Sequence, residues 1–375
     1  MVIVEELSNS KKVKIEGNTR VGINELPDEI LCHILSFLQS EEAVGNSLVS
    51  RRWRNLWKLC RSFNFYGSNT KHGRITPIMS LRSEFEERVN NVLQSYQGFN
   101  IPELRLCFDL DKSSLSHINK WIEIALTKKV KKLELDFTPF SFDPRRPKDL
   151  YYPFPQECFP CTNFLTCLSL SYLNVNDEIL GSILSNFPML EVLLISKSPL
   201  LRNAIVSALR LKQLSIFSCR RLLANAFPYD QLVTLTLRII RFDTQVINWQ
   251  SIPKLTSLRH LTCEVTPFPK NSLLLTSLIE ASPFLHKFKL NTILNGRLME
   301  GIVEQKEVNG QPNKYLKEVE IIGFCGSNAD VEIVTYLLKT AIMLEKIVIK
   351  TKSAAAKALA HQLVKNHACE LRLES

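Results

Sequence analysis

The chain has 375 residues, 45% of them hydrophobic and 22% charged, and this composition excludes a disordered or fibrous protein. The net charge is +10, but the cations are scattered among 37 acidic residues without a long basic run, so charge alone does not predict a nucleic-acid partner. No apolar run of about 18 residues could span a membrane, and the first residues lack the pattern of a signal peptide. We therefore expect an intracellular protein, in the cytoplasm and/or the nucleus, with its ten cysteines reduced.

Residues 20–65, which follow an unpatterned stretch at 1–19 that predicts a flexible tail, predict a small all-α module of three short helices. The first helix should begin at Pro27, because proline lacks the N–H that would be unpaired there, and Asp28 and Glu29 suit the positive end of the helix dipole. Its apolar side chains recur at helical spacing, at Ile30, Leu31, Ile34, Leu35 and Leu38. A module of fewer than ~40 residues cannot bury so many large side chains alone, so we expect a partner to cover part of them.

The residue pattern of this module resembles an F-box, the segment that binds a Skp-type adaptor in SCF ubiquitin ligases. The resemblance rests on Leu26-Pro27, the apolar run that follows, Ser50-Arg51-Arg52-Trp53 and Leu56-Trp57. It implies a Skp-type adaptor as partner and, through the adaptor, cullin and RING subunits. The contact candidates that it implies are Leu26, Pro27, Ile30, Leu31, Ile34, Leu48, Val49, Trp53 and Trp57.

Residues 66–100 predict a connection followed by a capping helix. Ser83 and Glu86 have the S-x-x-E spacing of a capping box, which predicts that the helix starts there. One face of this helix should be apolar, with Phe85, Val89, Val92, Leu93 and Tyr96.

Residues 101–375 predict an irregular α/β solenoid, because the leucine-rich-repeat template L-x-x-L-x-L recurs there. Each unit offers a short strand whose alternate leucines must be covered by neighbouring units. Helical spacing between strands predicts helices around Trp121, Leu180 and Val334. The template fits at Ile101-Leu104-Leu106, Val130-Leu133-Leu135, Leu165-Leu168-Leu170, Leu190-Leu193-Ile195, Leu211-Leu214-Ile216, Leu232-Leu235-Leu237, Leu258-Leu261-Cys263, Leu285-Phe288-Leu290, Leu316-Val319-Ile321, Leu344-Ile347-Ile349 and Ala368-Leu371-Leu373.

Two segments stand apart within the solenoid. Six prolines between Pro139 and Pro160 exclude a helix or a central strand and predict an insertion between two repeats, either an idle loop or a partner contact. Residues 312–375 resemble the FBD segment that closes many plant F-box proteins, and this resemblance implies no chemistry. The whole chain thus resembles a plant F-box protein with leucine-rich repeats and an FBD-like end.

No pattern of catalytic or cofactor-binding residues is present. The sequence lacks a phosphate-binding G-x-x-x-x-G-K-[ST] loop, H-E-x-x-H and G-x-S-x-G. Cys158 and Cys161 form one C-x-x-C, but no second pair or nearby histidine completes the four ligands of a structural zinc site. We expect no metal, no cofactor and no catalysis by the chain itself.

The middle repeats carry an uncharged patch on the strand positions that alternate with the leucines. Charged residues occupy the same positions on either side, so the patch has the layout of an interface core and rim. A plain solvent-exposed face remains an alternative, because single exposed apolar residues are normal. The candidate target-binding residues are Ser169, Leu194, Ser215, Phe217 and Thr236.

Three functions are compatible with these features. The first is a substrate receptor of an SCF-type ligase, with the adaptor on the F-box and a target protein on the repeats. The alternatives are a small-molecule-dependent receptor of the same ligase class and a nucleic-acid-binding repeat protein, for which steep salt dependence of binding would be the sign.

Overall fold

The computed structural model describes most of the chain, in the ranges given at the end of this paragraph. The expected tail at residues 1–19 lies outside the described residues. No helix within the described part is long and apolar enough to cross a membrane. The structure describes residues 23–36, 52, 56, 62–68, 70–71, 74–96, 98–141, 147, 150–155, 161–198, 200–201, 210–217, 231–240, 254–266, 273–292, 310–365, 367 and 369–374.

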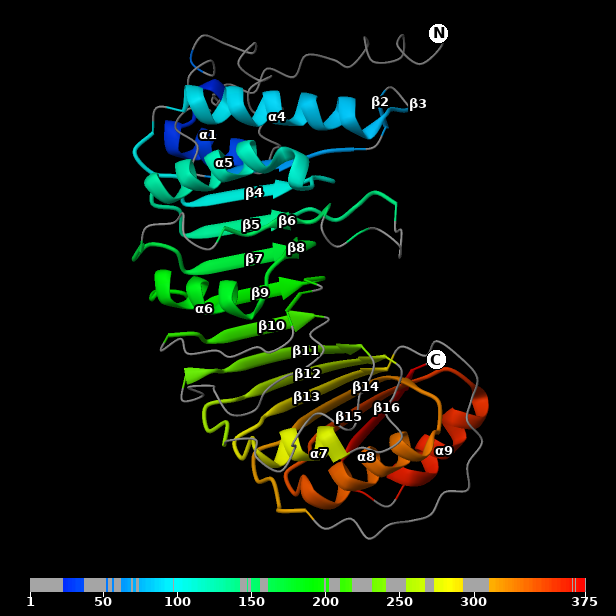
Figure 1. Ribbon diagram of the computed structural model, residues 1–375. Coiled ribbons are helices and arrows are strands. Elements are labelled where there is room, and N and C mark those ends of the chain that lie inside the picture. Colours follow the sequence, from blue (N-terminus) through cyan, green and yellow to red (C-terminus); the bar gives the residue numbers. More distant parts are fainter. Residues whose placement is uncertain are drawn as a thin grey trace, which may run out of the picture.

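The described chain is built on one twelve-stranded parallel sheet whose strands follow the order of the sequence. Figure 1 shows the strands stacked in that order, with those from β11 onward tilted relative to those before them, so that the sheet curves. The strands are β1 (Ser62–Tyr66), β4 (Glu103–Cys107), β5 (Lys132–Asp136), β7 (Cys167–Ser171), β9 (Val192–Ser196), β10 (Gln213–Phe217), β11 (Thr234–Ile240), β12 (His260–Thr266), β13 (Lys287–Thr292), β14 (Glu318–Phe324), β15 (Lys346–Thr351) and β16 (Glu370–Glu374).

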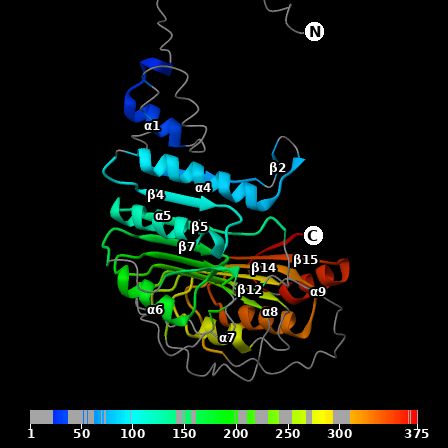
Figure 2. The same cartoon turned by 45° about the horizontal axis from the view of Figure 1, so that its top comes forward.

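The helices cover one face of this sheet (Figures 1 and 2). Asn176, Ser327 and Ser353 each accept a hydrogen bond from a backbone N–H in the first turn of α6, α8 and α9, which is why these helices begin where they do. The helices are α1 (Asp28–Ser36), α4 (Ile78–Ser95), α5 (Leu115–Thr127), α6 (Asp177–Asn186), α7 (Leu273–Glu280), α8 (Asn328–Thr340) and α9 (Ala354–Val364), with short 3-10 turns η1 (Ile23–Glu25) and η4 (Lys112–Ser114).

The predicted strand register is confirmed. The L-x-x-L-x-L leucines of each unit lie on the helix side of the sheet, for example Leu168 and Leu170, which are fully buried. Residues between them are half-buried, as alternation along a strand requires. One continuous core runs under the sheet from Leu31 of α1 to Val364 of α9. The opposite face of the sheet, which we call the open face, carries no described helix.

The boundary predicted at residue 101 is wrong, because the sheet begins at Ser62. Phe63 and Phe65 of β1 are buried and pair in register with Leu104 and Leu106 of β4. Helix α4 therefore crosses over from one parallel strand to the next and belongs to the first repeat. Residues 66–100 also contain a two-stranded hairpin of β2 (Thr70–Lys71) and β3 (Arg74–Ile75).

The predicted start of α4 is also wrong. The helix begins at Ile78, after Pro77, and Ser83 lies within it, where its hydroxyl donates to the carbonyl of Met79 at 3.2 Å. Proline stops the preceding segment and suits the beginning of a helix, so it decided the start against the S-x-x-E pattern. The predicted apolar face is confirmed, since Phe85, Val89, Val92, Leu93 and Tyr96 are all buried.

Aromatic residues fix the proline-rich insertion to the solenoid, and Tyr152 is the most deeply buried of those described. Tyr152 is fully buried, packs edge-on against Phe137, and donates its hydroxyl to Oδ1 of Asn119 at 2.6 Å. The pair β6 (Tyr152–Pro153) and β8 (Leu173–Asn174) forms a separate two-residue ladder beside the main sheet. The prediction of no central strand in the insertion is confirmed for its described residues.

Candidate functional site

The first candidate surface lies on helix α1. The backbone N–H groups of Ile30 and Leu31 both bond to the carbonyl of Pro27 at 3.1 Å, so the helix starts where the sequence predicts. Ile30 is 47% exposed and Pro27 is exposed. Leu26 and Ile34 are half-buried against the core. The side chain of Ile30 is therefore accessible to a partner.

The other predicted contact residues are a buried leucine, Leu31, and four residues outside the described part of the chain. Leu31 is fully buried in the core cluster that includes Leu56 and Phe63, so it presents no surface here, and its contact with a partner stays a prediction. The same cluster continues into the leucines of the repeats. Four other candidates lie outside the described residues, namely Leu48, Val49, Trp53 and Trp57.

An ion pair fixes the beginning of α1. The guanidinium of Arg52 donates through Nε to Oδ1 of Asp28 at 2.9 Å and through Nη2 to the carbonyl of Leu26 at 2.6 Å. The pair is well exposed, so its energy is small, and its value lies in geometry. It holds the chain from which Pro27 and Ile30 project.

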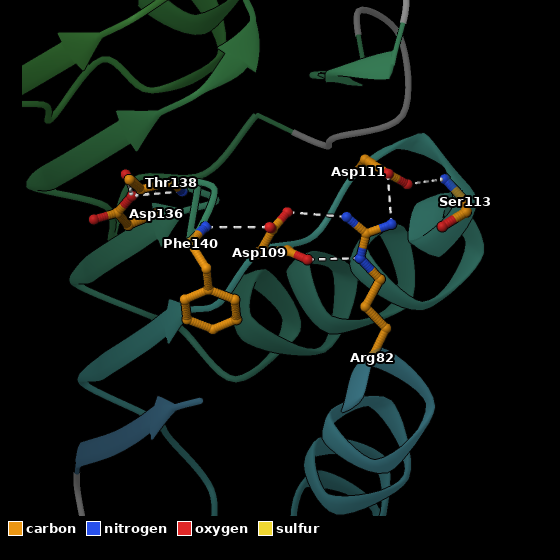
Figure 3. A network of polar contacts seen from close by, with 7 residues as sticks. All are labelled: Arg82, Asp109, Asp111, Ser113, Asp136, Thr138 and Phe140. Carbon is orange, nitrogen blue, oxygen red and sulfur yellow. Dashed lines mark hydrogen bonds and ion pairs between the residues drawn. The ribbon is translucent and has the colours of Figure 1, made fainter. Parts of the chain in front are cut away.

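A buried polar cluster joins α4 to the first repeats, and we call it the junction clamp: Arg82, Asp109 and Asp111 (Figure 3). Arg82 donates through Nε to the carbonyl of Asp109 at 2.6 Å and through Nη2 to its Oδ1 at 2.9 Å. Nη1 reaches Oδ2 of Asp111 at 2.5 Å. Oδ2 of Asp109 also accepts the backbone N–H of Phe140 at 3.2 Å, so the clamp reaches the start of the insertion.

The electrostatics of the clamp favour the ionised form of Asp111. Burial alone raises the pKa of this carboxyl, but hydrogen bonds from Ser113 and the positive charge of Arg82 outweigh it and hold the pKa below its usual range. The backbone N–H of Ser113 donates to Oδ1 of Asp111 at 2.8 Å. Because guanidinium and carboxylates are oriented by backbone groups, the clamp is a rigid link and offers no open position for a substrate.

The second candidate surface is the middle of the open face. The strand register places Ser169, Leu194, Ser215 and Thr236 side by side on β7, β9, β10 and β11. Phe217 lies in the next row, opposite Ser196. The structure therefore brings the five predicted target-binding residues together. Ser215 is buried among its neighbours, and the other four are half-buried.

The flanks of this patch carry charges that are paired across adjacent strands. The pairing has electrostatic consequences: the hydrogen bond with Glu318 raises the pKa of Lys287, and the same bond lowers the pKa of Glu318. Four of the ion pairs join register partners on adjacent strands, namely Arg105–Glu134 at 2.7 Å, Lys287–Glu318 at 2.9 Å, Lys289–Glu320 at 2.8 Å and Lys350–Glu374 at 3.0 Å.

Most of the described cysteines are partly buried, and Cys263 is fully buried. Burial raises the pKa of Cys107 and of Cys263 to about 12, so neither is a thiolate near neutral pH. Cys161 is exposed, and Cys158 lies outside the described residues. Within the described part of the chain, no three His, Cys, Asp or Glu side chains are placed to hold a metal ion.

Comparison with known proteins agrees with this arrangement at both ends. Residues 23–63 match the model of the F-box-like family, and residues 228–373 match the model of the At1g61320/AtMIF1 LRR domain. The chain therefore carries an F-box-like segment and a leucine-rich-repeat segment, and in both it is similar to plant F-box proteins with leucine-rich repeats. The F-box-like match covers α1 and ends within β1, the first strand of the sheet.

Similar proteins occur in Arabidopsis thaliana. The putative F-box/LRR-repeat protein At3g28410 is 29% identical over 187 residues, which are 46% of this chain and 37% of that protein. The putative F-box protein At3g29830 is 28% identical over 258 residues, covering 62% and 55% of the two chains, respectively. The F-box/FBD/LRR-repeat protein At1g78750 is 29% identical over 187 residues, covering 47% and 36%. The matched part of the chain thus spans between 36% and 55% of the length of these relatives.

Sequence reasoning missed the junction clamp. Arg82 stands on the apolar face of α4, and Asp109 and Asp111 follow the end of β4. A cation on an otherwise apolar helix face is a signal of a buried ion pair, because an unpaired buried charge is too costly. The sequence alone gives no indication of which acids would meet it.

Proposed function

We propose that this chain is the substrate-receptor subunit of an SCF-type E3 ubiquitin ligase. In this proposal helix α1 and the rest of the F-box bind a Skp-type adaptor, and through it cullin and RING subunits, while the open face of the sheet binds a target protein. The observation that carries it is the F-box-like segment at residues 23–63 with an exposed apolar residue, Ile30, on a helix anchored to a repeat sheet.

The chain would contribute proximity and no chemistry of its own. Holding a target at a fixed position beside a ubiquitin-loaded enzyme converts an encounter between two molecules into a reaction within one complex. This role needs two binding surfaces and a stiff connection between them. The buried core that includes Leu31 and the junction clamp support such a connection.

The adaptor contact is tested by substituting a residue that the chain itself does not need. Ile30→Asp places a charge on the exposed face of α1, and apolar contact residues at interface centres typically contribute about 2 kcal/mol or more, so we expect at least about a tenfold loss of adaptor affinity. Met79→Asp is the matched control, because Met79 is 61% exposed on the neighbouring helix α4.

The measurement is co-purification of the full chain with a Skp-type adaptor, followed by titration calorimetry. We expect Met79→Asp to bind like the unmodified chain. Equal binding by both variants would refute the role of α1. The target surface is tested by Leu194→Asp combined with Phe217→Asp, which should leave adaptor binding unchanged because both residues lie on the open face.

A further inference from the structure

The charges of the open face neutralise each other across the sheet. In each of the four ion pairs named above, the two residues are direct register partners on adjacent strands, as in Arg105 opposite Glu134 and Lys289 opposite Glu320. The pairing between β13 and β14 extends to a third strand, because Lys350 of β15 also lies 3.5 Å from Glu320. A cation in such a pair already has its acceptor.

Other open-face cations of the described strands have an acid beside them. Lys132 lies opposite Glu103, and Lys346 lies between Glu318 and Glu370 in the register. Arg372 is bonded to Glu374 at 3.1 Å. An incoming phosphate would therefore meet a neighbouring carboxylate at each of these positions.

The patch between the charged flanks is small and rich in hydroxyl groups. Ser169, Ser171, Ser196 and Ser215 lie on β7, β9 and β10, and the hydroxyl of Ser196 donates to that of Ser171 at 2.8 Å. Four adjacent strands have three spacings of ~4.8 Å and span about 14 Å, and three open-face positions along a strand span about 13 Å. These dimensions suit a single segment of polypeptide and are too small for a whole domain.

We infer that the open face recognises its target through an uncharged, unphosphorylated segment of polypeptide. This inference rests on the proposed function. Leu194 and Phe217 supply the apolar contacts, and the surrounding serine and threonine hydroxyls bond the backbone or small polar groups of the segment. The patch itself is neutral, and the ion pairs on either side of it neutralise each other. These charges therefore do not attract a charged partner.

The inference excludes two other ligand classes at this face. Recognition of phosphoserine or phosphothreonine uses unpaired arginine or lysine side chains that form charge-assisted hydrogen bonds. Binding of a nucleic acid uses many such cations and weakens steeply with salt. Among the described strands of the open face, β7, β9 and β10 carry no Lys or Arg, and the cations of the flanking strands are paired with a carboxylate or lie opposite one in the register.

The test uses the full chain co-purified with its Skp-type adaptor and two probes. One probe is a phage-displayed library of random 16-residue peptides, and the other is a degenerate phosphoserine and phosphothreonine peptide library with its unphosphorylated counterpart. We expect enrichment of peptides with few charges, retention that changes less than about twofold between low and high salt, and no preference for the phosphorylated pool.

Three variants locate the binding. Leu194→Asp combined with Phe217→Asp should reduce the enrichment at least tenfold, and so should Ser169→Arg, which adds bulk and charge at a half-buried small residue and guards against misfolding of the first variant. Lys289→Gln, the matched control, breaks one ion pair beside the patch and should change enrichment less than twofold.

Enrichment of phosphorylated or acidic peptides, or the lack of any enrichment, would overturn the inference, as would equal enrichment by the unmodified chain and both patch variants. Adaptor binding is measured in the same samples. Loss of adaptor binding by the unmodified chain would refute the proposed function, whereas retained adaptor binding with a preference for phosphopeptides would refute the inference alone.

Discussion

The junction clamp allows a quantitative prediction from a single substitution, Arg82→Met. Arg82 has a side chain only 9% exposed, and the side chains of its partners Asp109 and Asp111 are 10% and 12% exposed. Methionine keeps most of the volume but leaves two buried carboxylates without their cation. Breaking a buried ion pair in this way typically costs about 3–5 kcal/mol, so we expect a loss of that order in the free energy of unfolding.

The matched control is Arg105→Met on the open face. Arg105 and Glu134 form an ion pair of similar length, 2.7 Å, but their side chains are 35% and 30% exposed. Solvent screening limits such a pair to about 1 kcal/mol or less. The two variants remove the same kind of side chain, but Arg82 is buried and bonded to two carboxylates, whereas Arg105 is partly exposed and bonded to one.

Urea unfolding, followed by far-ultraviolet circular dichroism, measures the difference. With m-values of about 1–3 kcal/mol per molar for a cooperative unit, Arg82→Met should lower the urea midpoint by about 1 M or more. Hydrogen exchange should rise first in α4 and in residues 109–115. Equal midpoints for Arg82→Met and Arg105→Met would refute the reasoning.

The pH dependence of this variant has a definite sign. In the unmodified protein the pKa of Asp111 is lowered, so the carboxylate stabilises the fold above its unfolded pKa of about 3.9, and this stability is lost only as the pH falls through the lowered folded pKa. Without Arg82, burial should raise the pKa of Asp111, and stability is then lost as the pH rises through it. The deficit of Arg82→Met should therefore shrink as the pH is lowered from neutral. A constant deficit would show that charge burial is not its cause.

Two further predictions concern the insertion and the thiols. Tyr152→Phe removes the hydrogen bond to Asn119 and should cost about 1 kcal/mol, with faster hydrogen exchange in residues 150–155; unchanged exchange there would show that the bond does not anchor the insertion. Iodoacetamide at about pH 8 should alkylate exposed Cys161 before Cys107 and Cys263, whose pKa values are raised to about 12; site-resolved mass spectrometry showing Cys263 modified first would contradict its burial.

The repeats could be predicted from sequence because their signal is doubly periodic. Leucines such as Leu214 and Leu235 alternate with other residues along each strand and recur from unit to unit. Only one strand register buries the leucines of all neighbouring strands on the same face of the sheet. Strand β1 was not predicted, because Phe63 and Phe65 stand in place of the leucines of the repeat template. It also follows the F-box-like segment, which has no strand pattern. Its burial is decided by pairing with β4, and no local pattern shows that pairing.

The candidate sites divide in the same way. The alternation of inward and outward residues placed Leu194 and Phe217 on the open face, as strand geometry requires. The F-box resemblance also set Leu31 among the partner contacts, although an apolar helix face serves an internal core and an external partner equally well. Arg82 lies 27 and 29 residues from its two acids, and only the folded chain brings them together.

The central claim is that adaptor and target bind separate surfaces of one chain. The most direct test is affinity purification with mass spectrometry from plant cells expressing the unmodified chain, Ile30→Asp, or Leu194→Asp with Phe217→Asp. The account predicts that Ile30→Asp loses the Skp-type adaptor and cullin and keeps the target, and that the double variant loses only the target. Loss of both sets of partners in each variant, or of neither, would contradict it.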